Sequence, residues 1–532
     1  MTTAPVNTAA ARSQPALADP SPNGQRAGWS GSTRLPSFLP LVLLAALFVS
    51  FASCDVETEF LTGDAVELRF STDTLSFDTV FTARGSATRS FRVYNDGNQP
   101  VRIDRIRVEG RTGVNFIFNA DGVRGPEARD VVVWGQDSIF VFVEVEVDPT
   151  EPTAVSPFIA EDRLVFETGE AATGVHLLAF GQNANYVNGF ARGQFRRITC
   201  DGGTATFPTD LPTVIYGSLI IDSCAVQALA GTELYFHGGV QRNAQFAGSG
   251  FFNDGLIFTQ AQGSLQLLGT REAPVVVRTD RLEAEFATSP AKYRGLIFGA
   301  GSRGNLLQHT VLTNAIAGIT LDSLAEVTID DSVIAYCGGP AVTGYQADVT
   351  VRNSLFHSNF GDAVRMIKGG NLTLEHTTVA SYGADAGSLV LTNFDCDENG
   401  ENCLFAPLRT RVRNSIIAGS RGSELTFLDI FGGEEPSQWN VRVDNSVVKT
   451  DASFLNSQDG LFADFYETDC MGCVNVTFND PLFVDLNADD YQLDSLSVAR
   501  DLGVFLPTLP RDLLGTARPA DAVDAGAYEY VD

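Results

Sequence analysis

The sequence predicts an all-β chain in which a small β-sandwich precedes a parallel β-helix, and three observations carry that prediction. The chain has 532 residues with 50 Gly and 22 Pro, which is enough length for two separate cores. Residues from about 60 to 185 alternate apolar and polar side chains in short runs. A six-residue pattern then recurs six times between residues 307 and 448.

Residues 1–54 are interpreted as an export signal. Arg34 precedes an apolar run that begins at Phe38 and ends just before Cys54. Such a run is typical of a signal peptide and is short for a membrane-spanning helix. Residues 51–54 (FASC) resemble the lipobox of bacterial lipoproteins, which implies acylation of Cys54 and an anchor in the outer membrane. Cleavage without lipidation is the alternative. The acidic start after Cys54 resembles surface-export signals of some Bacteroidetes lipoproteins, which implies exposure at the cell surface.

Seven cysteines remain after Cys54, and their spacing predicts three disulfides of the kind that persist in oxidising compartments. The alternative for the last pair is a redox or metal site, but no nearby His completes a metal site, so a surface disulfide is favoured. Cys337 is left over and is predicted to be a buried free thiol. The predicted pairs are Cys200 with Cys224, Cys396 with Cys403, and Cys470 with Cys473.

Residues 55–187 are predicted to form an immunoglobulin-like β-sandwich that acts as a spacer. Residues 140–147 (FVFVEVEV) alternate, which places one face on a core and the other partly in water. Several short strands separated by Gly, Asn and Asp turns are typical of this fold. Residues 93–98 (VYNDGN) and the strand after them resemble spindle- and hydin-type immunoglobulin-like domains. That resemblance implies a structural role.

The repeat determines the predicted architecture of the second domain. Each unit alternates apolar and polar residues and places His, Asp or Asn before Ser or Thr. The spacings of 22, 22 and 23 residues fit one coil of a parallel β-helix, while the later spacings of 38 and 31 indicate insertions. A leucine-rich repeat needs a different Leu and Asn spacing. The units begin at Leu307, Ile329, Val351, Leu374, Val412 and Val443.

The polar residues of the repeat are interpreted as turn residues that stack on one another. Identical positions on adjacent coils lie about 4.8 Å apart, so their side chains can satisfy each other. A catalytic role is the alternative, and the recurrence of His309 and His376 in one register favours the structural one. The turn residues are His309, Asp331, Asn353, His376, Asn414 and Asn445.

Residues 188–479 are predicted to form the β-helix, and residues 480–532 its closing segment. The stretch from Gly217 (GSLIIDSC) resembles the opening coils of right-handed parallel β-helix lipoproteins of Bacteroidetes. Residues 480–503 and 523–530 resemble the closing segment of pectate-lyase-like proteins, which implies that this segment caps the open end of the solenoid. That superfamily contains lyases, glycosidases and proteins without known activity, so the resemblance implies the fold and leaves the function open.

The charge balance argues against nucleic acid as a partner. There are 36 basic and 65 acidic residues, a formal net charge of −29, and no cluster of basic residues stands out in the sequence. Phosphate-backbone binding depends on clustered Lys and Arg that release counterions.

Candidate catalytic residues are few. Lyases of the β-helix class need a base such as Arg or Lys and charge neutralisation near a uronate carboxyl group. Lys368, with Arg365 and His357 nearby in sequence, is the candidate cluster, and a solvated lysine in a Gly-rich turn is the alternative. No paired-Asp signature of a glycosidase is evident.

One acidic loop is a calcium candidate. Its oxygen ligands stand at alternate positions before a Gly, as in the first half of a calcium-binding loop, but Ala406 stands where a closing Glu belongs. A disulfide-braced surface loop is the alternative. No cofactor other than calcium is indicated. The candidate ligands are Asp395, Asp397, Asn399 and Glu401.

The sequence supports two functional hypotheses. The first is a non-catalytic surface lipoprotein in which a β-helix on a sandwich spacer binds glycan or serves an adhesive or structural role in the envelope. The second is an extracellular polysaccharide lyase or glycoside hydrolase of the pectate-lyase-like class. The first is preferred because no complete catalytic set is present.

Overall fold

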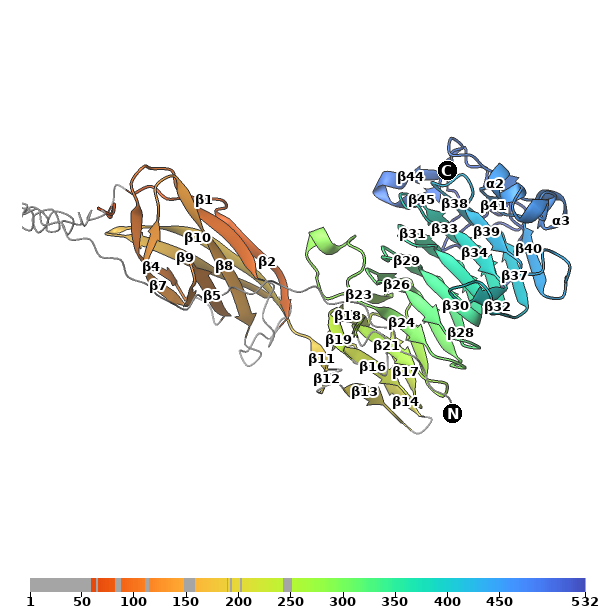
Figure 1. The fold of residues 1–532 in the computed structure, drawn as a ribbon, viewed down its shortest axis with the longest axis horizontal. Coiled ribbons are helices and arrows are strands. Elements are labelled where there is room, and N and C mark those ends of the chain that lie inside the picture. Colours follow the sequence, from red (N-terminus) through yellow and green to blue (C-terminus); the bar gives the residue numbers. More distant parts are fainter. Residues whose placement is uncertain are drawn as a thin grey trace, which may run out of the picture. The chain divides into compact units, whose positions relative to one another are not determined.

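The computed structural model describes residues 59–63, 66–81, 88–110, 114–147, 158–188, 190–191, 194–200, 203–242 and 251–531. Nearly all regular structure within them is β, as the sequence predicts (Figure 1). Cys54 lies outside the described residues. No helix in the described part of the chain is long and apolar enough to cross a membrane.

The first domain consists of two five-stranded sheets around an apolar core. Alternation explains the arrangement, because Val141, Val143 and Val145 are fully buried while the residues between them face outward. All neighbouring strands are antiparallel except the pair β2 and β10. The sheets are, in order, β1 (Arg69–Phe70), β3 (Arg89–Asn95), β8 (Asp137–Val147), β5 (Val114–Ala120) and β6 (Val123–Gly125), and β2 (Thr74–Phe81), β10 (Ala171–Gln182), β9 (Phe158–Thr168), β4 (Val101–Val108) and β7 (Glu127–Val133).

The second domain is a parallel β-helix in which each coil contributes one strand to each of three stacks. Stacks 1 and 2 together form most of an 18-stranded sheet, and stack 3 is an 11-stranded sheet. Stack 3 already begins at β11 (Asn185–Asn188), three residues before the predicted boundary at residue 188. It continues with β15 (Thr213–Tyr216), β18 (Glu233–His237), β23 (Val275–Thr279), β26 (Thr310–Thr313), β29 (Val333–Ala335), β31 (Leu355–His357), β33 (Thr378–Ser381), β38 (Ile416–Gly419), β41 (Val447–Val448) and β43 (Val474–Asn475).

Stacks 1 and 2 share two long strands, β30 (Val342–Arg352) and β32 (Val364–Glu375), which pass through both. The other strands of stack 1 are β13 (Gln194–Ile198), β16 (Ser218–Ile221), β21 (Leu256–Thr259), β24 (Gly295–Phe298), β27 (Ile319–Leu321), β34 (Leu389–Thr392) and β39 (Leu425–Leu428). Those of stack 2 are β14 (Thr204–Thr206), β17 (Ala225–Leu229), β22 (Ser264–Leu268), β25 (Asn305–Gln308), β28 (Glu326–Asp330), β37 (Leu408–Arg413), β40 (Trp439–Asp444) and β42 (Cys470–Met471).

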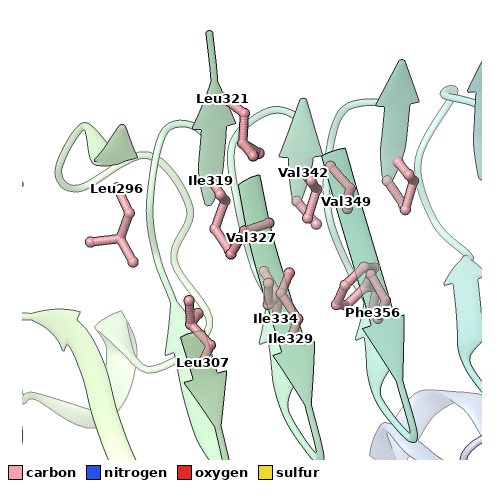
Figure 2. Packing of buried hydrophobic residues seen from close by; sticks show 14 of the residues in the cluster. Leu296, Leu307, Ile319, Leu321, Val327, Ile329, Ile334, Val342, Val349 and Phe356 are labelled. Atoms are coloured by element: carbon pink, nitrogen blue, oxygen red, sulfur yellow. The ribbon is translucent and has the colours of Figure 1, made fainter. Parts of the chain in front are cut away.

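The interior of the β-helix is filled by rows of apolar side chains, one from each coil. Leu296, Ile319 and Val342 are successive partners in stack 1 and are essentially inaccessible to solvent. Figure 2 shows them directed into the coils, where they meet residues such as Ile329 and Phe356 from the other stacks. Full burial of each such side chain contributes about 1.5–3 kcal/mol, which makes this continuous core the main source of stability.

The turn between stacks 2 and 3 confirms the interpretation of the repeat. All six predicted turn residues have a φ between 43° and 50°, in the left-handed region that Asn and Asp adopt more readily than most residues. Side chains of neighbouring turns contact each other in the pairs His309–Asp331, Asp331–Asn353 and His376–Asn414, and Asn353 Nδ2 donates to Asp331 Oδ1 at 2.5 Å. The hydroxyl groups that follow the turns also form hydrogen bonds between adjacent coils. Ser332 Oγ accepts from Thr310 N, and Ser354 Oγ accepts from Ser332 N, both at 3.0 Å.

The C-terminal segment differs from its predicted position. Instead of capping the open end, it packs along the outer face of stack 3, where Leu355, Ile416 and Val447 meet Leu482 and Leu493. Figure 1 shows β44 (Phe483–Asp485) and β45 (Asp490–Leu493) beside these strands. The outer residues of stack 3 are apolar in this region, so a covering segment removes them from water.

The end of the β-helix is closed by residues 452–468. The short helices α2 (Ala452–Leu455) and α3 (Phe465–Thr468) insert Phe454 and Phe465 into the core. Phe454 packs edge-on against Phe427 of the last full coil, with ring centroids 5.3 Å apart. The aromatic residues therefore perform the capping that was predicted for the C-terminal segment.

Candidate functional site

The outer face of stack 1 carries a groove that extends over four adjacent coils. Outward-facing residues form a continuous row in the strand register from Phe258 through Ile297 and Thr320 to Thr343 and Arg365. The groove lies above the first four coils of this row and has a volume of about 570 Å³. Its lining residues are Phe252, Asn253, Phe258, Arg294, Ile297, Thr320, Asp322 and Tyr345.

A glycine allows adjacent coils of stack 1 to approach closely beneath the groove. Gly295 starts β24 with a φ of 116°, and a Cβ atom there would lie 1.9 Å from the carbonyl oxygen of Ala317. Only glycine allows the two coils to approach this closely. Tyr345 stands on the outer side of β30 with 38% of its surface exposed. Asp322 directly follows β27, and its carboxylate accepts a hydrogen bond from Ser323 N at 2.6 Å.

The candidate cluster of His357, Arg365 and Lys368 is divided between two sheets. Arg365 and Lys368 both belong to β32, whereas His357 ends β31 in stack 3. Arg365 is oriented by Asp362, because its Nε donates to Asp362 Oδ2 at 2.9 Å. The structure therefore places two of the three predicted residues on one strand and the third in another stack.

Lys368 occupies a corner of the backbone. Its φ is 58°, and Gln346 and Leu324 hold the same left-handed conformation between stacks 1 and 2 on the preceding coils. Gly369 follows at a point where a Cβ atom would lie 2.3 Å from Ala406 O. The position of Lys368 is thus explained by the turn, and a catalytic role for it stays a prediction.

His357 is buried under the C-terminal segment. Its Nδ1 lies 3.1 Å from Ser358 Oγ and 3.5 Å from Asp489 Oδ1, and its ring packs against Tyr491. Burial lowers the pKa of His357 from 6.5 to about 4 despite the nearby carboxylate. Burial alone would raise the pKa of Asp489, but hydrogen bonds from Tyr336 and Ser358 together with His357 lower it.

Serine, histidine and aspartate meet here without forming a catalytic triad. In a triad the base contacts the nucleophile through one ring nitrogen and the orienting carboxylate through the other. Here Ser358 and Asp489 both face Nδ1, and Ser358 Oγ also donates to Asp489 Oδ1 at 2.9 Å. The arrangement fixes the C-terminal segment to the coils.

The acidic loop is a β-hairpin, β35 (Phe394–Cys396) and β36 (Cys403–Phe405), inserted between β34 and β37. The carboxylate of Asp397 accepts hydrogen bonds from Asn399 N at 3.2 Å and Glu401 N at 3.0 Å, so it organises the turn. Within the described ranges no group of three or more His, Cys, Asp or Glu side chains is placed to hold a metal ion. Calcium binding by this loop stays a prediction.

The cysteine prediction is confirmed. Disulfides join Cys200 to Cys224, Cys396 to Cys403, and Cys470 to Cys473. The second of these braces the inserted hairpin. Cys337 is a buried free thiol, and burial raises its pKa to about 12.

One cluster of basic residues was not predicted from the sequence. Arg409, Arg411 and Arg413 occupy alternate positions of β37 and all face outward from stack 2, beside Arg442 of β40. The expectation that no basic cluster exists was therefore wrong for this face. The available signal was the pattern LRTRVR of residues 408–413, in which three arginines alternate with residues that prove to be buried.

A comparison with protein families agrees with the architecture of the second domain. The family model described as "Right handed beta helix region" matches residues 214–379. No curated protein matches the sequence. Among solved structures, the catalytic domain of a GH87 alpha-1,3-glucanase in complex with nigerose is 10% identical, with 69% of this chain and 81% of that chain covered and a TM-score of 0.24.

Two further solved structures show the range of similarity. The catalytic unit of a thermostable GH87 alpha-1,3-glucanase from Streptomyces thermodiastaticus is 12% identical over 67% of this chain and 80% of that one, with a TM-score of 0.25. A family 123 glycoside hydrolase from Clostridium perfringens is 5% identical with a TM-score of 0.16, and the match spans 23% of this chain and only 30% of the hydrolase. Identities this low do not extend to activity.

Proposed function

We propose that the protein is an exported, lipid-anchored surface protein whose β-helix binds a polysaccharide along the outer face of stack 1. One observation carries the proposal, namely the groove over four coils in which Phe258 and Tyr345 lie beside Asn253, Arg294 and Asp322. Apolar ring surfaces with a few polar groups are typical of ligand sites. Because successive strands are about 4.8 Å apart, such a face offers a repeating surface to a chain-like ligand.

Binding without cleavage is favoured over hydrolysis. Glycoside hydrolysis needs two carboxyl groups on either side of the scissile bond. Among the described residues that line the groove, Asp322 is the one carboxylate. Asp254, which follows the lining residue Asn253, is a buried carboxylate. Asp362 precedes β32 and is paired with Arg365, whereas Asp322 follows the end of β27. Since the strands are parallel, Asp322 and Asp362 lie at opposite edges of stack 1.

The remaining parts of the proposal concern location. The signal sequence and Cys54 support export and lipidation, and three disulfides are typical of an oxidising compartment. Residues 55–187 would act as an immunoglobulin-like spacer. Loss of detergent partitioning in Cys54→Ala is the expected result for a lipid anchor, and unchanged partitioning would refute it.

The second candidate function is a polysaccharide lyase or hydrolase. The residues that would carry it are Arg365 and Lys368 on β32, Asp362 just before that strand, and Asp322 two coils earlier. A lyase would use one of the cations as base and produce unsaturated uronates.

One experiment tests both functions. The full-length protein is applied to immobilised neutral and acidic polysaccharides, including an alpha-1,3-glucan, while new reducing ends and unsaturated uronates are followed in solution. We expect retention on a glycan without product, and retention about 10-fold weaker for Tyr345→Ala. Phe478→Ala removes a more exposed aromatic ring elsewhere, 70% exposed against 38% for Tyr345, and serves as the control. Product that disappears in Asp322→Asn or Lys368→Ala would establish the second candidate instead.

A further inference from the structure

The outer face of stack 2 presents a strip of arginines on a strongly acidic protein. In β37, Leu408, Thr410 and Val412 point inward and are buried, so the arginines between them point outward. Arg409 and Arg411 are both exposed. Two residues apart on one strand, their Cα atoms are about 7 Å apart and on the same side.

The neighbouring strands supply groups that can accompany these cations. Arg411 is aligned with Thr373 of β32 on one side and with Arg442 of β40 on the other. Arg409 lies between Asn371 and Asn440. Each arginine is thus flanked by hydroxyl, amide or further guanidinium groups rather than by a carboxylate.

The carboxylates of this face are already engaged by other residues. Glu375 forms an ion pair with Arg413, and Asp444 forms one with Arg442 at 3.0 Å. The residues aligned with Glu375 and Arg413 on the preceding coils are paired as well. There, Arg352 donates two hydrogen bonds of 2.7 Å to the carboxylate of Asp330. Among the residues that the structure describes, Arg409 and Arg411 have no such ion pair.

These residues surround a shallow groove of about 450 Å³. It runs across β32, β37 and β40, and thus along the axis of the β-helix. No aromatic side chain lines it in the described part of the chain, and its lining residues are Asn371, Leu372, Thr373, Arg409, Thr410, Arg411, Asn440, Arg442 and Asp444.

We propose that this groove binds an anionic polysaccharide, with Arg409 and Arg411 contacting its carboxylate or sulfate groups and Arg442 completing the strip. A planar guanidinium group binds carboxylate and sulfate oxygens through two parallel hydrogen bonds. The amides of Asn371 and Asn440 and the hydroxyl of Thr373 are suited to the hydroxyl groups of sugars. The site is separate from the groove on stack 1, and it does not depend on the function proposed there.

The lining argues against nucleic acid as the occupant. Single-stranded nucleic acids are held by aromatic side chains that stack on bases, and this groove has none. Backbone recognition of duplexes needs more cationic contacts than this strip offers, on a chain whose net charge is −29. A polysaccharide needs only a few anionic contacts along a polar groove.

The test measures binding of the full-length protein to fluorescent polygalacturonate and to dextran sulfate, with neutral dextran and a single-stranded oligonucleotide of matched length as comparisons. Arg409→Gln/Arg411→Gln is expected to weaken binding of the preferred polyanion roughly 10-fold or more, since two charge-assisted contacts are lost. Arg409→Lys/Arg411→Lys should bind with an affinity between those of the parent protein and the glutamine double variant. Affinity of the parent protein should fall as salt is raised from 50 to 500 mM, as expected for exposed charges screened within about 10 Å at 0.1 M salt.

A matched control removes two arginines from other exposed positions of the β-helix. Arg197→Gln/Arg303→Gln changes the net charge equally and should leave the affinity unchanged. The proposal is overturned if neither polyanion binds, or if Arg409→Gln/Arg411→Gln weakens binding no more than the control Arg197→Gln/Arg303→Gln does. It is also overturned if the oligonucleotide binds as tightly as the preferred polysaccharide. Thermal unfolding of each variant establishes that the fold is retained. Binding of neutral glycan on stack 1 is read separately with Tyr345→Ala, so the two proposals can fail independently.

Discussion

At the scale of single residues, the fold depends on polar side chains in left-handed turns. The six turn residues of the repeat share one backbone conformation, and two of them also hold the C-terminal segment. Asn414 donates to Val504 O at 2.7 Å and accepts from Val504 N at 3.0 Å. The sequence predicted the turn residues because they recur in register, but the contacts with Val504 join residues 90 positions apart and leave no local signal.

Asn414→Ala is expected to destabilise the protein by about 2–4 kcal/mol, because it combines a left-handed alanine with loss of buried hydrogen bonds. Asn445→Ala provides the matched control. Asn445 has the same backbone conformation, with a φ of 49° against 50°. Asn445→Ala should therefore lower the free energy of unfolding by only about 1–2 kcal/mol, the cost of a left-handed alanine. Urea unfolding of both variants measures the difference, and equal losses would contradict the role assigned to the Asn414 side chain.

The burial of His357 predicts that the stability of the fold depends on pH. Its pKa is about 4 in the folded protein, against about 6.5 in an unfolded chain. The unfolded chain therefore binds more protons between these values, and the free energy of unfolding should fall by up to about 3 kcal/mol as the pH is lowered through that window. Glu529 acts in the opposite direction, since burial raises its pKa to about 7 and its contribution is lost as the pH rises from 4.5 to 7.

His357→Phe separates these two effects. The phenyl ring can occupy the space between Tyr336 and Tyr491, and it takes up no proton. Urea midpoints measured from pH 4 to 7 should then show a shallower loss of stability toward acid than in the parent protein. An unchanged slope would mean that other groups determine the acid sensitivity.

At the scale of elements, the repeat predicted strands and turns well where each coil has the standard length. The three segments from Leu307 to Phe356 place their turns at the observed positions. The passage of β30 and β32 through two stacks was not predictable, because the corner at Gln346 carries no turn signature and the Gly-rich turn at Lys368 predicts a break in the strand. Lys368 was accordingly singled out for chemistry, although its conformation is explained by the corner it occupies.

The C-terminal segment is an element held by a buried ion pair. The guanidinium of Arg518 is fully buried against Glu529, and its Nη2 donates to Asn353 Oδ1 at 2.9 Å. The sequence predicted that this segment closes the β-helix. Its docking along stack 3 could not be predicted, since it depends on which outer faces of the coils are apolar.

Arg518→Met is expected to destabilise this segment by about 3–5 kcal/mol, because a buried carboxylate is left without its partner. The measurement is limited proteolysis, with earlier cleavage expected within residues 476–532 while the coils stay intact. Arg518→Met/Glu529→Gln should recover part of the loss, since no charge is then left unpaired. Proteolysis of the single variant at the parental rate would show that apolar packing alone holds the segment.

At the scale of the whole molecule, the order of a β-sandwich and a β-helix was predictable because strand alternation and a repeat period are properties of long stretches of sequence. The functional faces were not predictable in the same way. The groove on stack 1 assembles Asn253, Asp322 and Tyr345 from three different coils, and nothing in their sequence spacing relates them. The arginine strip lies within one strand and could have been found from its alternation.

The central claim is that stack 1 of the β-helix is the glycan-binding face. Its most direct test is amide hydrogen exchange of the full-length protein, alone and saturated with the polysaccharide that is retained best. Protection is predicted in peptides that contain residues 252–258, 294–298, 320–324 and 343–346, with no change in the sandwich strands. Protection confined to the sandwich, or to the C-terminal segment, would contradict the account.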